Sequence, residues 1–137
     1  MEYIVKKEIN VEDFLRLREE LGWKQLGKSQ LEKAISGSMI NQSVFLDDEC
    51  VGMGRVVGDG ALKGMLTDIM VSKKHQQKGI GKIIVTTLIK EIEEILTEGE
   101  QFQLEASPTE GNREFYIKCG MKYKPENQDG VYLWIKK

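Results

Sequence analysis

Residues 65–106 constrain the fold more than any other part of the chain. An apolar, strand-like run at 65–71 precedes a glycine turn, and a second strand-like run follows at 102–106. Between them, residues 79–96 carry apolar side chains at helical spacing, at positions 80, 83, 84, 88, 92 and 95. A strand, a helix and a strand in this order predict a right-handed crossover that joins parallel or near-parallel strands. The chain is therefore expected to be a mixed α/β protein built around one sheet.

The rest of the chain adds short elements to this unit, and we expect one domain over residues 1–137. The length suits a single hydrophobic core, and the sequence shows no internal repeat and no linker-like stretch. Asn10 can cap the first helix, and Gly22 is expected to end it. Further strands are expected at 3–7, 43–46, 51–57 and 131–135, and further helices at 11–21, 29–35 and 108–119.

Composition excludes several classes of protein. The 20 Lys+Arg against 22 Asp+Glu give a formal net charge of -2, which disfavours a nucleic-acid-binding protein. No apolar run is long enough for a membrane helix, and the N-terminus lacks the pattern of a secretory signal. Cys50, Cys119 and the single histidine, His75, are too few for the usual metal sites. We expect a cytoplasmic protein with no metal, no membrane partner and no nucleic-acid partner.

The turn before the long helix has the features of a phosphate-binding loop. It reads VSKKHQQKGIGK over residues 71–82. Glycines let the backbone turn tightly and approach a ligand, and the first amides of a helix carry partial positive charge and lack internal partners. Such a helix N-terminus binds phosphate groups. Of the four lysines in the loop, Lys78 and Lys82 are expected to contribute to phosphate binding, and the other two are expected to lie on a solvated surface.

Two nucleotide-binding motifs fail on single residues of this loop. A P-loop requires Ser or Thr after its Gly-Lys pair, and Ile83 stands there instead. The dinucleotide fingerprint requires a small residue where this chain has Ile84. A turn with no ligand remains the plainer interpretation of a glycine pair.

What remains is Gln76-x-x-Gly79-x-Gly81 after the strand-like run 66–71, and it resembles the acyl-CoA-binding motif of the GNAT superfamily of N-acetyltransferases. A second stretch, from Asn112 through Tyr116 to Gly120, resembles that family's second signature, although Met121 stands where the family has an aromatic residue. The resemblance covers nearly the whole chain. It implies an α/β (α+β), single-domain GNAT-like fold with a central mixed, mostly antiparallel sheet of about six to seven strands and about four helices.

The resemblance further implies an acetyl-CoA-dependent N-acetyltransferase, in which a primary amine of a small molecule or peptide attacks the thioester directly. It assigns Tyr116 as the general acid, the backbone N–H of Met70 to the thioester oxygen, and Asn112 to the pantetheine arm or the helix entry. As a plainer alternative, Tyr116 is a core aromatic residue. The expected cofactor-binding residues are Ile69, Met70, Val71, Gln76, Gln77, Lys78, Gly79, Ile80, Gly81, Lys82, Asn112 and Tyr116.

The acceptor, the base and the biological role stay open. Glu105 and Asp68 are candidate general bases, with a structural role as the alternative for each. Arg18 and Trp23 are expected on the acceptor side, which would suit an aromatic or acidic small molecule, and Trp23 is equally compatible with the core. A non-catalytic acyl-CoA sensor on the same fold is the alternative function. The resemblance also leaves open a homodimer through sheet edges.

Overall fold

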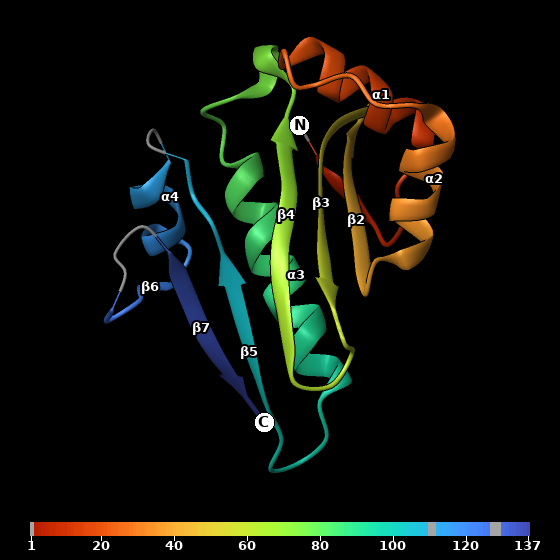
Figure 1. Ribbon diagram of the computed structural model, residues 1–137. Coiled ribbons are helices and arrows are strands. Elements are labelled where there is room, and N and C mark those ends of the chain that lie inside the picture. Colours follow the sequence, from red (N-terminus) through yellow and green to blue (C-terminus); the bar gives the residue numbers. More distant parts are fainter. Residues whose placement is uncertain (1, 110–111, 127–129) are drawn as a thin grey trace.

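The protein folds around one seven-stranded sheet with helices on both of its faces (Figure 1). The computed structural model describes residues 2–109, 112–126 and 130–137. The strand order is β1-β2-β3-β4-β5-β7-β6, and every neighbouring pair is antiparallel except β4 and β5, which are parallel. The strands are β1 (Ile4–Lys6), β2 (Ile40–Leu46), β3 (Glu49–Gly58), β4 (Lys63–Val71), β5 (Gln101–Ala106), β6 (Lys122–Tyr123) and β7 (Val131–Lys136), and the α-helices are α1 (Val11–Glu20), α2 (Lys28–Gly37), α3 (Ile80–Ile95) and α4 (Arg113–Lys118). The expected mixed, mostly antiparallel GNAT-like sheet is confirmed.

Helix α3 covers one face of the sheet and forms the crossover between the two parallel strands. Its apolar stripe, with Ile84 and Leu88 fully buried, faces the larger core cluster. Gly54 on β3 allows this close packing, because a Cβ there would lie only 2.5 Å from a side-chain methyl of Ile84. The helical spacing of residues 79–96 therefore predicted the helix and most of the face that it buries, although Ile95 of the expected stripe is 47% exposed.

Helices α1 and α2 cover part of the opposite face (Figure 1). Phe14, Leu17 and Leu31 from these helices pack with Met53 and Met70 from β3 and β4 in a second core cluster. The expected cap of α1 is confirmed: the side-chain oxygen of Asn10 accepts hydrogen bonds from the first-turn amides, at 2.9 Å and 3.3 Å. This cap fixes where α1 begins and, with it, where the segment after α1 meets the end of β4.

Strands β4 and β5 separate along their length, and this separation positions the site. They pair only where Lys63–Met65 lies beside 103–105, and beyond that point Figure 1 shows the two strands diverging. Strand β4 also carries a bulge opposite β3, where the register shifts and Asp68 adopts a φ of 55°. The later half of β4 therefore presents backbone groups that β5 does not pair.

Some elements differ from those expected from the sequence. The last helix spans Arg113–Lys118 rather than 108–119, and residues 110–111 of that prediction lie outside the described residues. Strand β6 is two residues long and was not predicted, and neither was the short 3₁₀ helix Lys73–His75. Within the described residues, no helix is long and apolar enough to cross a membrane.

Candidate functional site

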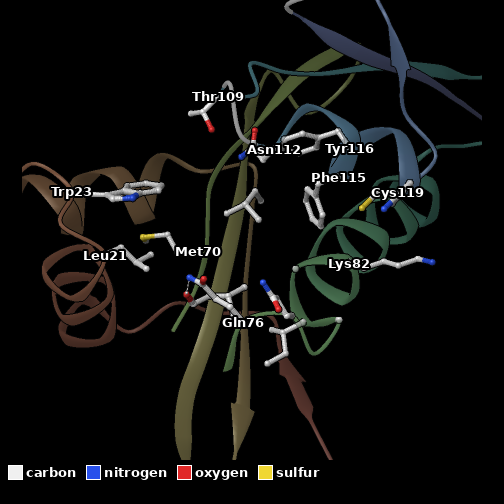
Figure 2. Close-up of a pocket in the computed structure, with 17 residues that line it drawn as sticks. Leu21, Trp23, Met70, Gln76, Lys82, Thr109, Asn112, Phe115, Tyr116 and Cys119 are labelled. Carbon is white, nitrogen blue, oxygen red and sulfur yellow. Dashed lines mark hydrogen bonds between the residues drawn. The ribbon is translucent and has the colours of Figure 1, made fainter. Parts of the chain in front are cut away.

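A pocket of about 950 Å³ opens where β4 and β5 separate. The end of β4 and the loop into α3 form its floor, α4 forms one wall, and the segment after α1 forms the other, as the side chains in Figure 2 show. The lining residues are Leu21, Trp23, Ile69, Met70, Val71, Gln76, Gln77, Gly79, Ile80, Gly81, Lys82, Thr109, Asn112, Phe115, Tyr116, Lys118 and Cys119. Every residue expected from the sequence to bind the cofactor lines this pocket except Lys78.

The loop into α3 lines the pocket and has an unusual backbone shape. Gln77 and Gly79 both adopt left-handed conformations, with φ of 63° and 84°. The side-chain amide of Gln76 donates to the carbonyl of Val71 at 3.1 Å and ties the loop back to β4. No side chain caps α3, so its first amides remain available for an anionic ligand. Left-handed backbone at a non-glycine residue is uncommon and gathers at ligand-binding turns.

Gly81 has a different role from the one that the sequence indicated. A Cβ at this position would lie 3.1 Å and 3.2 Å from the Phe115 ring, so the missing side chain gives room to α4 rather than directly to a ligand. Phe115 in turn stacks edge-on against Tyr116, with ring centroids 5.1 Å apart. Gly81 therefore sets how closely α4 approaches the start of α3, and with it the position of Tyr116.

Tyr116 and Asn112 face the pocket from α4 (Figure 2). Burial raises the pKa of Tyr116, so its hydroxyl keeps its proton throughout the neutral range. The side-chain oxygen of Asn112 is buried and accepts no hydrogen bond from the described residues, and it does not cap α4. A buried acceptor without a donor is costly, and a ligand with an amide N–H would satisfy it. The pantetheine arm of coenzyme A carries such amides.

The direction of the β4 amides changes one assignment made from the sequence. The N–H of Ser72 donates to the Val51 carbonyl on β3. Met70, two residues before Ser72 on the same strand, pairs with Met53 of β3. Because neighbouring residues of a strand point their amides to opposite sides, the Met70 N–H also faces β3. Val71, whose carbonyl accepts the Gln76 side chain, faces the gap, and Ile69 does so by the same alternation.

Asp68 is enclosed by two arginines and is absent from the pocket lining. The Arg55 side chain donates to one carboxylate oxygen at 2.6 Å, and Arg18 lies 3.7 Å from the other. Arg55 also donates to the Ala34 carbonyl and the Ser38 hydroxyl on and after α2. The network joins α1, α2, β3 and β4, and a carboxylate used in this way is poorly placed to remove a proton from a substrate.

Glu105 also lies outside the pocket lining and forms ion pairs with two lysines. It is 8% exposed, and its two oxygens meet the ammonium groups of Lys124 and Lys63. The hydrogen bond from Lys124, assisted by that from Lys63, holds the pKa of Glu105 below its ordinary value. A general base gains efficiency from a pKa near the working pH, so this environment opposes such a role.

On the acceptor side, the structure separates the two residues that the sequence grouped. Trp23 lines the pocket and is 38% exposed, whereas Arg18 lies beneath it and pairs with Asp68. Sequence reasoning missed Leu21, Thr109, Phe115, Lys118 and Cys119 as lining residues. The aromatic residue beside Tyr116 was part of the quoted signature and was the available signal for Phe115. No cluster of three or more potential metal ligands occurs among the described residues.

Comparison with known proteins identifies the family. The model of the acetyltransferase (GNAT) family matches residues 7–121, which is most of the chain. The chain belongs to this family. A relative described as an uncharacterized N-acetyltransferase, from Gracilaria tenuistipitata var. liui, is 25% identical over 132 residues, covering 92% of this chain and 69% of the relative.

Solved structures of GNAT-like proteins share the fold. A GNAT family acetyltransferase from Streptococcus pneumoniae superimposes with a TM-score of 0.70 at 28% identity, over 89% of this chain and 87% of that chain. N-acetylglutamate synthase from Neisseria gonorrhoeae, solved with coenzyme A and L-arginine, gives a TM-score of 0.77 at 15% identity, over 98% of this chain and 34% of that chain. At this identity, the second likeness shows the fold alone.

Proposed function

We propose that this GNAT protein is an acetyl-CoA-dependent N-acetyltransferase that moves an acetyl group to a primary amine. One observation carries the proposal: the left-handed glycine loop at the start of α3 and the tyrosine on α4, Tyr116, line the same pocket. The GNAT family uses acetyl-CoA. The pocket has a separate partner for each of three parts of that molecule: the phosphates, the amides of the pantetheine arm and the thioester sulfur.

The phosphate end is proposed to lie against the loop into α3. The amides of Ile80, Gly81 and Lys82 begin the helix without a side-chain cap, and all three residues line the pocket. Lys78 is exposed and outside the lining, so we assign it no direct contact. Asn112 is proposed to accept an amide N–H of the pantetheine arm, which would satisfy its buried oxygen.

The reacting end is proposed to lie between β4 and Tyr116. Acetyl-CoA supplies an activated thioester carbonyl and a thiolate leaving group. The Val71 or Ile69 amide, in place of Met70, is positioned to donate to the carbonyl oxygen as it gains negative charge. The Tyr116 hydroxyl holds a proton for the leaving sulfur, because burial keeps it un-ionised. Positioning of the two reactants supplies the rest of the rate enhancement.

We propose no dedicated base. Both carboxylates considered from the sequence, Asp68 and Glu105, are held in ion pairs away from the pocket lining. The amine would therefore attack from its neutral form and lose its proton to solvent afterwards. A rate that follows the fraction of neutral amine as pH rises is the expected behaviour.

Substitution of Tyr116 separates catalysis from mere binding. Tyr116→Phe is expected to bind acetyl-CoA with unchanged affinity in calorimetry and to lose about a hundredfold or more in kcat. Tyr3→Phe, at the opposite edge of the sheet beside β1, is the control and should keep full activity. Equal turnover by the Tyr116→Phe and wild-type proteins would contradict the assignment of the acid. Acetyl-CoA binding without turnover of any amine by the wild type would favour the acyl-CoA sensor instead.

A further inference from the structure

We propose that the α1 end of the pocket selects an amine carried on an apolar or aromatic group, and that Trp23 is the residue that determines this specificity. The inference rests on the proposed acetyltransferase function and names the class of its acceptor. That chemistry has two sources, a free arylalkyl or branched alkyl amine and the α-amine of a peptide with an apolar first residue, and the experiment below distinguishes them.

The two ends of the pocket differ in chemistry. On the α1 side the lining consists of Leu21, Trp23 and Met70, with Thr109 across the opening (Figure 2). Among the described lining residues the charged side chains are two lysines, Lys82 and Lys118, on the α3 and α4 side, and none is a carboxylate. An ammonium-rich acceptor such as a polyamine would meet no counter-charge in this lining. An apolar group would gain from contact with the indole and the Leu21 side chain, whereas Met70 is 1% exposed and packs in the core below them.

Arg18 does not convert this end into a site for an acidic acceptor. Two of its guanidinium nitrogens donate to the Lys24 carbonyl, at 3.1 Å and 2.6 Å, and the third lies 3.7 Å from Asp68. Its side chain is 11% exposed. An anionic substrate would have to break these contacts before it could pair with the guanidinium. Of the two acceptor classes that the sequence left open, the structure therefore favours the aromatic one.

The same arginine fixes the indole in place. The Arg18 guanidinium lies 5.6 Å from the centre of the Trp23 ring, and the backbone N–H of Trp23 donates to the Arg18 carbonyl at 2.9 Å. The Trp23 side chain thus remains 38% exposed at the pocket although its backbone is anchored. A rigid, partly exposed aromatic surface binds apolar groups with little loss of conformational entropy.

Tyr116 lies on the wall opposite Trp23 (Figure 2). An amine whose apolar group packs on the indole would therefore point its nitrogen toward Tyr116, where the thioester is proposed to react.

Fluorescence of the indole tests the contact directly. The chain has two tryptophans, and Trp134 lies on β7 outside the pocket lining, so Trp134→Phe makes Trp23 the only tryptophan. Titration of this variant, loaded with coenzyme A, with 2-phenylethylamine should change the Trp23 emission in a saturable way. Spermidine and glutamate over the same range should produce no saturable change. Saturable changes with spermidine or glutamate but not with 2-phenylethylamine would overturn the inference.

Steady-state kinetics tests the specificity. Four acceptors are compared by thiol release from acetyl-CoA: 2-phenylethylamine, 3-methylbutylamine, a short peptide beginning with Phe, and spermidine. At least one apolar acceptor should have a higher kcat/KM than spermidine. Comparison of the small amines with the peptide then shows whether the natural acceptor is a free amine or a peptide N-terminus. Trp23→Ala should raise the KM of the best acceptor roughly tenfold with an unchanged KM for acetyl-CoA, and Trp23→Phe should recover most of the loss. Trp134→Ala is the control and should behave as wild type.

The outcomes separate this inference from the proposed function. Failure of the wild type to bind acetyl-CoA in calorimetry would overturn the proposed function itself. Binding of acetyl-CoA with preferred turnover of spermidine would overturn the acceptor class alone. Apolar-amine turnover that Trp23→Ala leaves unchanged would overturn the role of Trp23. Binding of acetyl-CoA without turnover of any apolar acceptor would also count against the inference.

Discussion

Replacing Gly79 by alanine tests whether the backbone shape of the loop binds the cofactor. Gly79 has a φ of 84°, and a Cβ added there would meet no atom within 4 Å. The cost of alanine is therefore conformational rather than steric, about 1–2 kcal/mol for a left-handed non-glycine residue. If the free protein relaxes that strain by changing the loop, binding must restore the loop at the same cost. Affinity for acetyl-CoA should then fall about 5–30-fold.

Gly99 provides a matched control for this experiment. It lies in the turn between α3 and β5, has a φ of 87°, and likewise has no atom within 4 Å of an added Cβ. Gly99→Ala introduces the same backbone strain away from the pocket lining. Gly99→Ala should lower the melting temperature by roughly 3–10 °C, since 1 kcal/mol corresponds to about 3–5 °C in a domain of this size. Gly79→Ala should lower it by less, to the extent that its loop relaxes the strain in the free protein.

Calorimetric titration with acetyl-CoA reads out the difference between the two variants. Gly99→Ala should bind as the wild type does, and Gly79→Ala should bind more weakly. Unchanged affinity in a Gly79→Ala protein whose melting temperature also stays near that of the wild type would refute the proposed role of the loop, because the loop would then have relaxed its strain with no effect on binding. Equal weakening by both substitutions would show that the loss follows from general destabilisation rather than from the loop.

Three further predictions concern groups around the pocket. Asp68→Asn should lower the free energy of unfolding by about 3 kcal/mol in urea titrations, because it leaves two largely buried arginines without their carboxylate. Asn tolerates the left-handed backbone at this position, so backbone strain adds little to the loss. A loss below about 0.5 kcal/mol would contradict the importance of the network. Glu105 has a lowered pKa, so its stabilising ion pairs are present above its ordinary value of 4.5 and are lost as pH falls through the lower, folded-state pKa. Wild type should therefore lose stability below about pH 4.5 more steeply than Glu105→Gln in denaturation at several pH values, and parallel profiles would be inconsistent with this linkage. Burial raises the pKa of Cys50 to about 11, so at pH 8 about one thiol in a thousand is ionised and iodoacetamide should modify it only after unfolding; rapid labelling of the native protein would show otherwise.

The crossover and the glycine turn before α3 were predictable because their signals are local. The helical stripe of α3 and the glycines of the loop lie within one continuous segment, so spacing alone indicates a helix and a turn. The Asn10 cap is similarly local, because its partners are two and three residues away. These features follow from backbone geometry and need no knowledge of distant contacts.

The roles of Asp68 and Gly81 depend on distant segments and could not be predicted in the same way. Asp68 meets arginines at positions 18 and 55, which only the packing of α1 and β3 brings together. Gly81 makes room for Phe115, which is 34 residues further along the chain. The direction of the Met70 amide depends on the register of β4 with β3. Strand β6 is too short for any periodic pattern and exists through its pairing with β7.

Isothermal titration of the purified protein with acetyl-CoA tests the central claim most directly, with ATP and NAD as comparison ligands. The account predicts saturable binding of acetyl-CoA, with at least tenfold weaker binding of ATP and NAD, since the pocket offers partners to the pantetheine arm as well as to phosphates. Absence of acetyl-CoA binding, or equal binding of all three ligands, would contradict it.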